Sequence, residues 1–276
     1  MSFGDLTRIN TNLQALRANN SLQMTNQRLG DAQLRLATGS RINSAADDSA
    51  GFALASQLEA RVRGQSQAQA NIGDAQSMLT VAEGGANTIM DIVQSLKEKA
   101  VQANNDSLGD EEVQLIQNQI EALRGEIDDI AAGTDFNGVN LLDGSIDGLT
   151  FQVDADSGDT FTTTALDDNF DSATLGIDAI DVTDDAGAAL DAVDSAIDTL
   201  AASLGGIGDA QNSLEFRLQN LTTATDNNEA ARSRIMDADF AKEQMEVVKQ
   251  QILQQTGTAA LAQANAAPQS VLSLLQ

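Results

Sequence analysis

The apolar positions of this chain recur at alternating steps of three and four residues over three long stretches. These stretches cover residues 78–96, 113–130 and 190–221, and in the third only Gln211 places a polar side chain on the stripe. This spacing is typical of helices that present a narrow apolar seam to other helices. The third stretch alone would extend about 48 Å at about 1.5 Å per residue, so the pattern predicts an elongated helical bundle.

The sequence also indicates where these helices begin and end. Ser44 and Ser107 precede acidic residues and offer N-caps, so we expect the first two helices to start there. Asn104 and Gly133 mark their expected ends. The polar stretch 222–228 is expected to break the apolar stripe, and a last helical stretch is expected to follow it.

Residues 134–182 have a different period. Apolar and polar residues alternate on both sides of the turn at residues 156–159, which predicts a β-hairpin. The aspartates of this turn also hint at a calcium loop, but the glycine lies one place too early for an EF-hand and the closing glutamate is missing. A hairpin turn with solvated carboxylates is the favoured interpretation.

Two amphipathic tails flank the bundle and should lie side by side, because the helices between them fold back on each other. Their apolar stripes are thin, and Pro268 is expected to limit the C-terminal one. We expect both tails to become ordered only when neighbouring subunits cover their remaining faces. The apolar tail residues that form the candidate assembly interface are Ile9, Leu13, Leu16, Leu22, Leu29, Leu36, Ile235, Phe240, Val248, Ile252 and Leu261.

The expected fold is therefore mainly α: an elongated antiparallel helical bundle with a small β-hairpin insert and paired terminal helices. Its expected segments are an N-terminal coiled-coil tail (1–43), the N-terminal part of a rod (44–142), a short β-rich outer insert (143–185), the C-terminal part of the rod (186–234) and a C-terminal coiled-coil tail (235–276).

The charge of the chain limits the classes of molecule that it can bind. With 41 acidic and 15 basic residues, the formal net charge is −26, which repels nucleic acid and anionic membranes, so we expect neither as a partner. No Lys or Arg lies between Arg124 and Arg217, so this acidic middle is predicted to be solvated. General solubility in salt explains the acidity equally well.

The sequence contains no His and no Cys, the residues that most often serve as catalytic bases, nucleophiles and transition-metal ligands. We predict no catalytic, metal or cofactor site, with an acidic enzyme or binding module as the alternative of a different class. The glycines at 84–85 and 205–208 interrupt heptad stripes, which indicates close helix packing or local flexibility. No signal peptide or membrane span is recognisable, which alone would indicate the cytoplasm.

Several segments resemble bacterial flagellins. They are residues 36–51, 134–142, 231–240, 251–257, 261–265 and 268–275. The residues that match the N-terminal family signature are Arg41, Ile42, Asn43, Ser44, Asp47, Asp48 and Gly51.

The resemblance implies a structural subunit that self-assembles into the helical flagellar filament, the propeller for swimming. It implies that the tails line the filament channel and that residues 44–225 form the surrounding rod. It also implies export through the flagellar type III secretion apparatus, so the expected location is extracellular rather than cytoplasmic. The implied partners are further copies of the chain, an export chaperone, the filament cap and hook-junction proteins. A hook–filament junction protein of the same family is the alternative.

The segment 93–102 is similar to the part of flagellins that an innate Toll-like receptor recognises. The family arginine corresponds here to Ser95, beside Gln94, and a supporting glutamate corresponds to Gln119. Because Ser95 cannot form bidentate charge-assisted hydrogen bonds, we expect weak recognition by this receptor.

Overall fold

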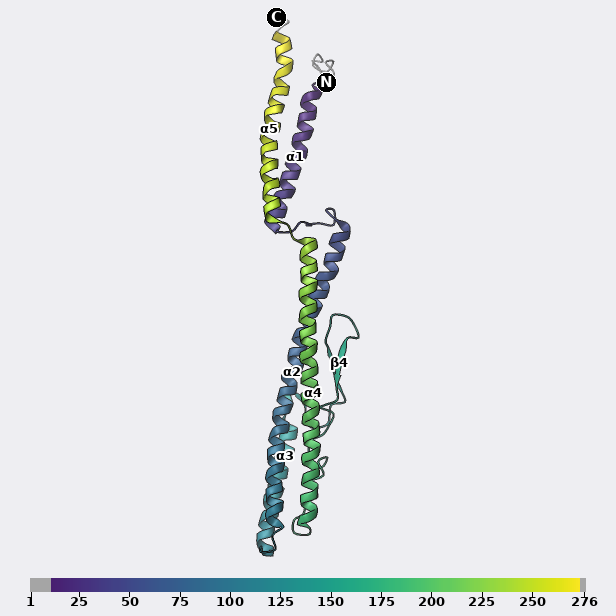
Figure 1. Ribbon diagram of the computed structural model, residues 1–276, viewed down its shortest axis with the longest axis vertical. Coiled ribbons are helices and arrows are strands. Elements are labelled where there is room, and N and C mark those ends of the chain that lie inside the picture. The colour runs from purple at the N-terminus through teal and green to yellow at the C-terminus, as the bar shows by residue number, and fades with distance from the viewer. Residues whose placement is uncertain (1–10, 274–276) are drawn as a thin grey trace. The chain divides into compact units, whose positions relative to one another are not determined.

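The computed structural model describes residues 11–273, with side chains to residue 266. Most of this range is helical, in agreement with the predicted mainly α fold (Figure 1). The helices are α1 (Leu13–Thr38), α2 (Ser49–Ala103), α3 (Asp110–Gly133), α4 (Ala186–Met236) and α5 (Phe240–Ser273). The strands are β1 (Asp135–Phe136), β2 (Val139–Asn140), β3 (Leu149–Gln152) and β4 (Thr160–Thr163).

The chain divides into two compact units. The central unit comprises residues 61–227, and the terminal unit comprises residues 1–60 and 228–276. The long helices α2 and α4 contribute to both. The five segments expected from the sequence stay a prediction.

Helices α2, α3 and α4 run alongside one another in the central unit (Figure 1). Side-chain pairs between α2 and α4 fix their antiparallel register: Lys97 forms an ion pair with Asp194, and Gln76 donates to Glu215 at 3.5 Å. The turn at residues 104–109 reverses the chain from α2 into α3. The predicted antiparallel bundle is therefore confirmed for this unit.

The apolar seam of α4 is rotated slightly from its predicted position. Every seventh residue from Val193 to Leu221 is buried, as the heptad pattern predicts. The other predicted positions, such as Leu190 and Leu204, are only half-buried. Small residues take their place in the core: Ala189, Ala196, Ser203 and Ala210. Because these side chains are small, another segment of the chain can pack closely against this side of α4.

That side of α4 meets residues 164–182, which we call the strap. The Ser203 hydroxyl of α4 donates to Asp168 of the strap at 2.7 Å. Although the strap lies in the acidic middle predicted to be solvated, its apolar side chains join the core of the central unit. They are Leu166, Phe170, Leu175, Ile177, Ile180 and Val182, all buried.

Two polar clamps hold the strap on α3. The buried Gln117 side chain donates to Ile180 O and accepts from Val182 N, each at 3.1 Å. The Asp128 carboxylate accepts from the backbone N and the hydroxyl of Ser172, at 2.7 and 3.0 Å. The expectation that the whole acidic middle is solvated is thus wrong for the strap, because hydrogen bonds satisfy its backbone while its apolar residues are buried.

The predicted hairpin is confirmed. Strands β3 and β4 pair antiparallel with Phe151 opposite Phe161, and the turn at residues 156–159 joins them. The Asp154 carboxylate beside this turn accepts from Gln65 of α2 at 3.4 Å. A second, shorter hairpin joins β1 to β2, with positive φ at both Asn137 (55°) and Gly138 (80°), as a type I′ turn requires.

The apolar stripe ends at residues 222–228 as predicted, since no residue of α4 after Leu221 is buried, but the helix itself does not break there and continues to Met236. The hydroxyls of Thr222 and Thr225 donate to the carbonyls of Leu218 and Leu221, each at 2.8 Å, so these residues are polar yet compatible with a helix. The break falls at residues 237–239 instead. There the Asp239 side chain accepts from the first free N–H groups of α5.

The predicted N-caps, Ser44 and Ser107, and the predicted helix end at Pro268 are wrong. Helix α2 is capped by Asp48 rather than Ser44, since the Asp48 carboxylate accepts from Gly51 N at 3.0 Å. Helix α3 begins after Gly109, whose N–H donates to Glu112 at 2.7 Å, so Ser107 is not its cap. Helix α5 runs past Pro268 to Ser273, although proline supplies no N–H to the helical series.

The glycines within the heptad stripes serve different purposes. A Cβ at Gly85 would lie 2.6 Å from the Thr134 hydroxyl, so this position requires glycine for close packing. Gly84, Gly205 and Gly208 face open space, and no close approach explains them.

Candidate assembly interface

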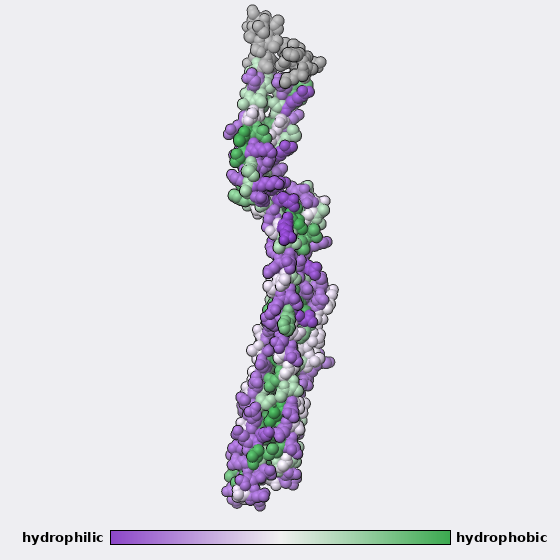
Figure 2. Space-filling view, in the orientation of Figure 1, coloured by the Kyte–Doolittle hydropathy of each residue, from purple (hydrophilic) through white to green (hydrophobic). Residues whose placement is uncertain are grey.

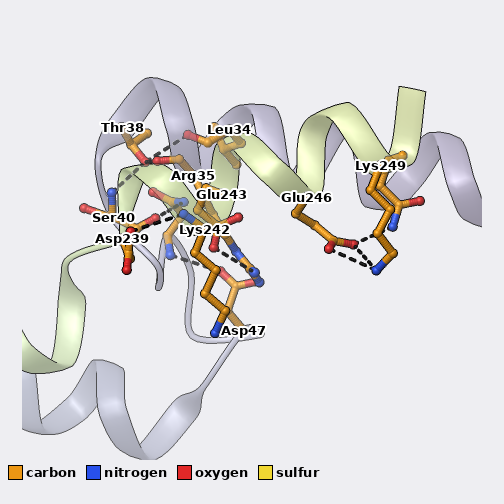
Figure 3. Close-up of polar contacts among 12 residues, drawn as sticks. Leu34, Arg35, Thr38, Ser40, Asp47, Asp239, Lys242, Glu243, Glu246 and Lys249 are labelled. Atoms are coloured by element: carbon orange, nitrogen blue, oxygen red, sulfur yellow. Dashed lines mark hydrogen bonds and ion pairs between the residues drawn. The ribbon is translucent and has the colours of Figure 1, made fainter. Parts of the chain in front are cut away.

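Helices α1 and α5 of the terminal unit lie side by side and antiparallel, as predicted for the two tails (Figure 1). The Asn12 side chain, which also caps α1, donates to Ala264 O at 2.7 Å. Towards the other end of the pair, Arg35 lies 3.9 Å from Glu243, and Figure 3 shows the two side chains facing each other. Each helix therefore has an inner face towards its partner and an outer face.

The inner faces bury little apolar surface. Their core consists of Leu29, Ala32 and Val247, with Leu36 packed against it. The two helices approach closely at Gly257, where a Cβ would lie 3.2 Å from Leu22 Cδ1. Much of the inner face of α5 is polar, and it buries Glu243 and Gln250.

The outer face of α5 is more apolar than its inner face. Met245, Val248 and Ile252 fall within about 60° of one another around the helix, roughly opposite Val247 and Gln250. Their exposed fractions are 66%, 44% and 58%. A helix that exposes its more apolar side has a binding surface that its own chain does not cover.

Helix α1 has the same arrangement. At about 100° per residue, Leu16 and Leu34 project from the side roughly opposite Leu29 and Ala32, and Met24 lies on the flank between the two sides. Each is slightly more than half exposed. Figure 2 shows green, hydrophobic side chains on the surface of this helix pair. We call these six residues of α1 and α5 the outer face.

The predicted tail residues differ in how far the structure buries them. Leu22, Leu29, Leu36 and Leu261 are buried or half-buried, as are Leu13 and Ile235. Leu16, Phe240, Val248 and Ile252 are exposed. Ile9 lies outside the described residues. Sequence reasoning missed Met24, Leu34 and Met245, because it followed one stripe where each helix has two.

The connectors between helices hold the base of the helix pair. Residues 39–48 join α1 to α2, and residues 237–239 join α4 to α5. Ser40 and Asp237 form an isolated antiparallel bridge, and Arg41 N donates to Met236 O at 2.6 Å. The Arg41 guanidinium adds a bond to Ile235 O at 2.7 Å. The signature residue Arg41 thus ties the first connector to the C-terminal end of α4.

The remaining signature residues shape the first connector. The Asp47 carboxylate accepts from the backbone N–H groups of Asn43 and Ser44, at 3.0 and 2.9 Å, and these bonds hold the pKa of Asp47 below its ordinary value. Ile42 is buried beneath this loop. A Cβ at Gly51 would lie 2.8 Å from Ile42 Cδ1, so a larger residue there would have to displace this side chain.

Charge is divided very unequally between the units. The central unit carries 31 of the 41 acidic residues and 6 of the 15 basic ones, a net formal charge of −25. The terminal unit, with 10 acidic and 9 basic residues, has a net charge of only −1. Ion pairs such as Lys249–Glu246 balance its surface (Figure 3). Copies of the chain therefore repel each other least through the terminal unit.

The residues predicted to correspond to the receptor segment lie in the central unit. Gln94 of α2 and Gln119 of α3 are exposed, and Ser95 is half-buried with its hydroxyl donating to Asp91 O at 3.0 Å.

Neither a metal site nor a membrane span is evident in the part of the chain that the structure describes. No three metal-ligating side chains gather there into a possible metal site. No helix in that part is both long and apolar enough to cross a membrane.

Comparison with known proteins identifies the family. The sequence matches the bacterial flagellin N-terminal helical region over residues 9–147 and the bacterial flagellin C-terminal helical region over residues 190–275. It is 36% identical to the flagellin of Halalkalibacterium halodurans, over 97% of this chain and 99% of that one. It is also 36% identical to the flagellin of Bacillus subtilis, over 98% of this chain and 100% of that one.

A solved structure from Vibrio parahaemolyticus, assigned as a flagellar hook-associated protein, has a TM-score of 0.58 and 16% identity. It covers 69% of this chain and 100% of that one, and it shows a shared fold alone. It does not favour the hook-junction alternative over a filament subunit. The matches to both flagellin regions, with two flagellins aligned over nearly the whole length, show that this chain belongs to the bacterial flagellins, the extracellular structural subunits of the flagellar filament.

Proposed function

We propose that this flagellin polymerises through the outer face of α1 and α5. The observation that carries the proposal is the inversion of polarity on α5: Glu243 and Gln250 face α1, while Met245, Val248 and Ile252 face outward. An exposed apolar surface of this kind marks a site where another molecule binds. In a filament, the molecule available is a second copy of the chain.

The energies support association through this surface. Burying a large apolar side chain contributes about 1.5–3 kcal/mol, so covering the exposed half of six such residues contributes about 5–10 kcal/mol per subunit. A head-to-tail contact between two different surfaces propagates a helical polymer when its rotation does not close into a ring. The nearly neutral terminal unit is the part of the chain where this gain meets the least repulsion.

The small inner core has a consequence for the free subunit. Ordering a residue costs about 1–2 kcal/mol of backbone entropy, and few buried side chains on α1 and α5 offset that cost. We propose that the helix pair becomes stably ordered only when neighbouring subunits cover its outer face. In the filament, α1 and α5 would then form the inner layer and residues 44–225 the surrounding rod.

Family membership supports further partners. We propose that the chain is exported unfolded by the flagellar secretion apparatus with the help of a chaperone, and that it meets the filament cap and the hook-junction proteins on assembly. We also propose a purely structural, non-catalytic role, consistent with a sequence without His or Cys. Recognition by the flagellin-sensing innate receptor is expected to be weak, because Ser95 stands where an arginine would bind.

Hydrogen exchange, followed by peptide mass spectrometry, tests the proposed interface. In the free subunit, amides of residues 13–38 and 240–266 should exchange quickly, while buried amides of α3 exchange slowly. In the filament, both sets should exchange slowly. Equal protection of α1 and α5 in the free subunit and in the filament would contradict the proposal.

A further inference from the structure

We infer that Met24 and Met245 are oxidation sites whose conversion to methionine sulfoxide prevents a free subunit from joining a filament. This inference rests on the proposed function of the outer face. The oxidant is hydrogen peroxide, and the modification is confined to subunits that have not yet assembled.

The two sites are more exposed than the other methionines in the described part of the chain. The sequence has six methionines, and five of them lie in the part of the chain whose side chains are described. Met24 is 53% exposed and Met245 is 66% exposed. Met78 is buried in the central core, and Met90 and Met236 are half-buried. A thioether reacts with a dissolved oxidant in proportion to its access to water.

Both exposed methionines belong to the outer face. Met245 lies beside Val248 and Ile252 on α5, and Met24 is exposed on the flank of α1. Methionine suits a surface that must adapt to a partner, because its side chain is flexible and polarisable. The same position makes its sulfur accessible before assembly and covered after it.

The chemistry is a two-electron oxygen transfer. The sulfur lone pair attacks one oxygen of hydrogen peroxide, a sulfur–oxygen bond forms and the O–O bond breaks. The departing hydroxide combines with the proton of the transferred oxygen to give water. The sulfur loses the two electrons that the peroxide gains, and a sulfoxide remains.

The sulfoxide changes what the outer face can bind. It replaces a flexible apolar group with a polar, chiral one, whose oxygen must find a hydrogen-bond donor when a neighbour covers it. Val248 and Ile252, which lie beside Met245 on the outer face, are apolar and offer none. We expect the critical concentration for polymerisation to rise at least about tenfold when both sites are oxidised.

The test oxidises the full-length free subunit with hydrogen peroxide, removes the peroxide and measures seeded polymerisation by sedimentation. Oxidised wild-type protein should show the tenfold or greater rise. Met24→Leu/Met245→Leu, which retains side-chain volume and apolarity, should polymerise equally well before and after treatment. The matched control, Met90→Leu/Met236→Leu, keeps both proposed sites and should lose polymerisation as the wild type does.

A second measurement covers the case in which the leucine variant fails to assemble. Methionine sulfoxide reductases applied to the oxidised wild type should restore polymerisation as sulfoxide disappears from Met24 and Met245. Reduction of both sites without recovery would overturn the inference. Normal polymerisation of the doubly oxidised wild type, or equal inhibition of the treated leucine variant, would also overturn it.

Peroxide treatment of finished filaments separates this inference from the proposed interface. If Met24 and Met245 oxidise as quickly in filaments as in free subunits, the outer face is not covered and both ideas fail. If both methionines are protected in filaments but oxidised subunits still polymerise, the proposed interface is supported and the inference that oxidation prevents assembly is wrong.

Discussion

Ile252 offers the sharpest test of how this flagellin assembles. Its side chain is 58% exposed and lies between Met245 and Val248 on the outer face of α5. Changing it to Ala removes apolar surface that the proposed neighbour would cover. Changing it to Asp adds the cost of covering a carboxylate. Neither change removes a contact in the inner core of the helix pair.

The expected magnitudes follow from this exposure. Complete burial of an isoleucine side chain contributes about 1.5–3 kcal/mol, and covering the 58% that is exposed therefore contributes about 1–2 kcal/mol. Ile252→Ala should raise the critical concentration about 5- to 30-fold, at about 1.4 kcal/mol per tenfold change. Enclosing the unpaired carboxylate of Ile252→Asp costs several kcal/mol more, which should abolish polymerisation at ordinary protein concentrations.

Seeded polymerisation followed by sedimentation measures these differences. Circular dichroism and urea unfolding should show that the central unit of each variant is as stable as in the wild type. Ser157→Asp, in the exposed turn of the β3–β4 hairpin, adds the same charge outside the interface and should polymerise almost normally. Filaments formed by Ile252→Asp at the wild-type critical concentration would refute the proposed role of the outer face.

Other predictions concern the central unit, the connector and the surface charge. Gln117→Leu leaves a buried carbonyl and a buried N–H of the strap unpaired, so urea unfolding should show a loss of about 2–5 kcal/mol, while exposed Gln114→Leu changes stability by less than about 0.5 kcal/mol. Two backbone N–H groups lower the pKa of Asp47 below 3.8. The ionised Asp47 therefore stabilises the folded chain above pH 3.8, and this stabilisation is lost as the pH falls through the lowered pKa. The difference in urea stability between the wild type and Asp47→Asn should shrink as the pH falls through this range. The critical concentration should fall as salt rises from 0.01 to 0.1 M, because the Debye length decreases from about 30 to about 10 Å; light scattering independent of salt would exclude this electrostatic effect. Ser95→Arg should increase activation of the flagellin-sensing receptor in reporter cells, and an unchanged dose response would contradict the assignment of this position.

The long helices could be predicted because large apolar residues repeat at three and four over many turns. The fine position of the α4 seam could not, because Ala196 and Ser203 are buried through their smallness, and a search for large apolar residues passes over them. The continuation of α4 through Thr222 and Thr225 was missed for a related reason. Their hydroxyls bond within the helix, so polarity there marks solvent exposure rather than a helix end.

The strap was harder to foresee than any helix. Its buried residues, such as Leu166, Phe170 and Ile177, follow neither a period of 2 nor a period of 3.6, and aspartates surround them. Only the three-dimensional positions of Gln117 and Asp128 explain why this acidic segment is held against the helices. In the tails, both faces of each helix carry apolar residues, so spacing alone could not separate inner from outer positions.

The exposed turn of the β3–β4 hairpin determines where this protein can accept foreign sequence. The turn at residues 156–158 is exposed, Gly158 has open space around it, and the strands on either side are joined by the pairing of Phe151 with Phe161. A guest peptide or small domain with adjacent ends can be grafted at this turn without displacing any core residue of the strap. Because the filament repeats its subunit, each graft would be displayed at the density of the polymer, which makes the turn a natural position for a multivalent array.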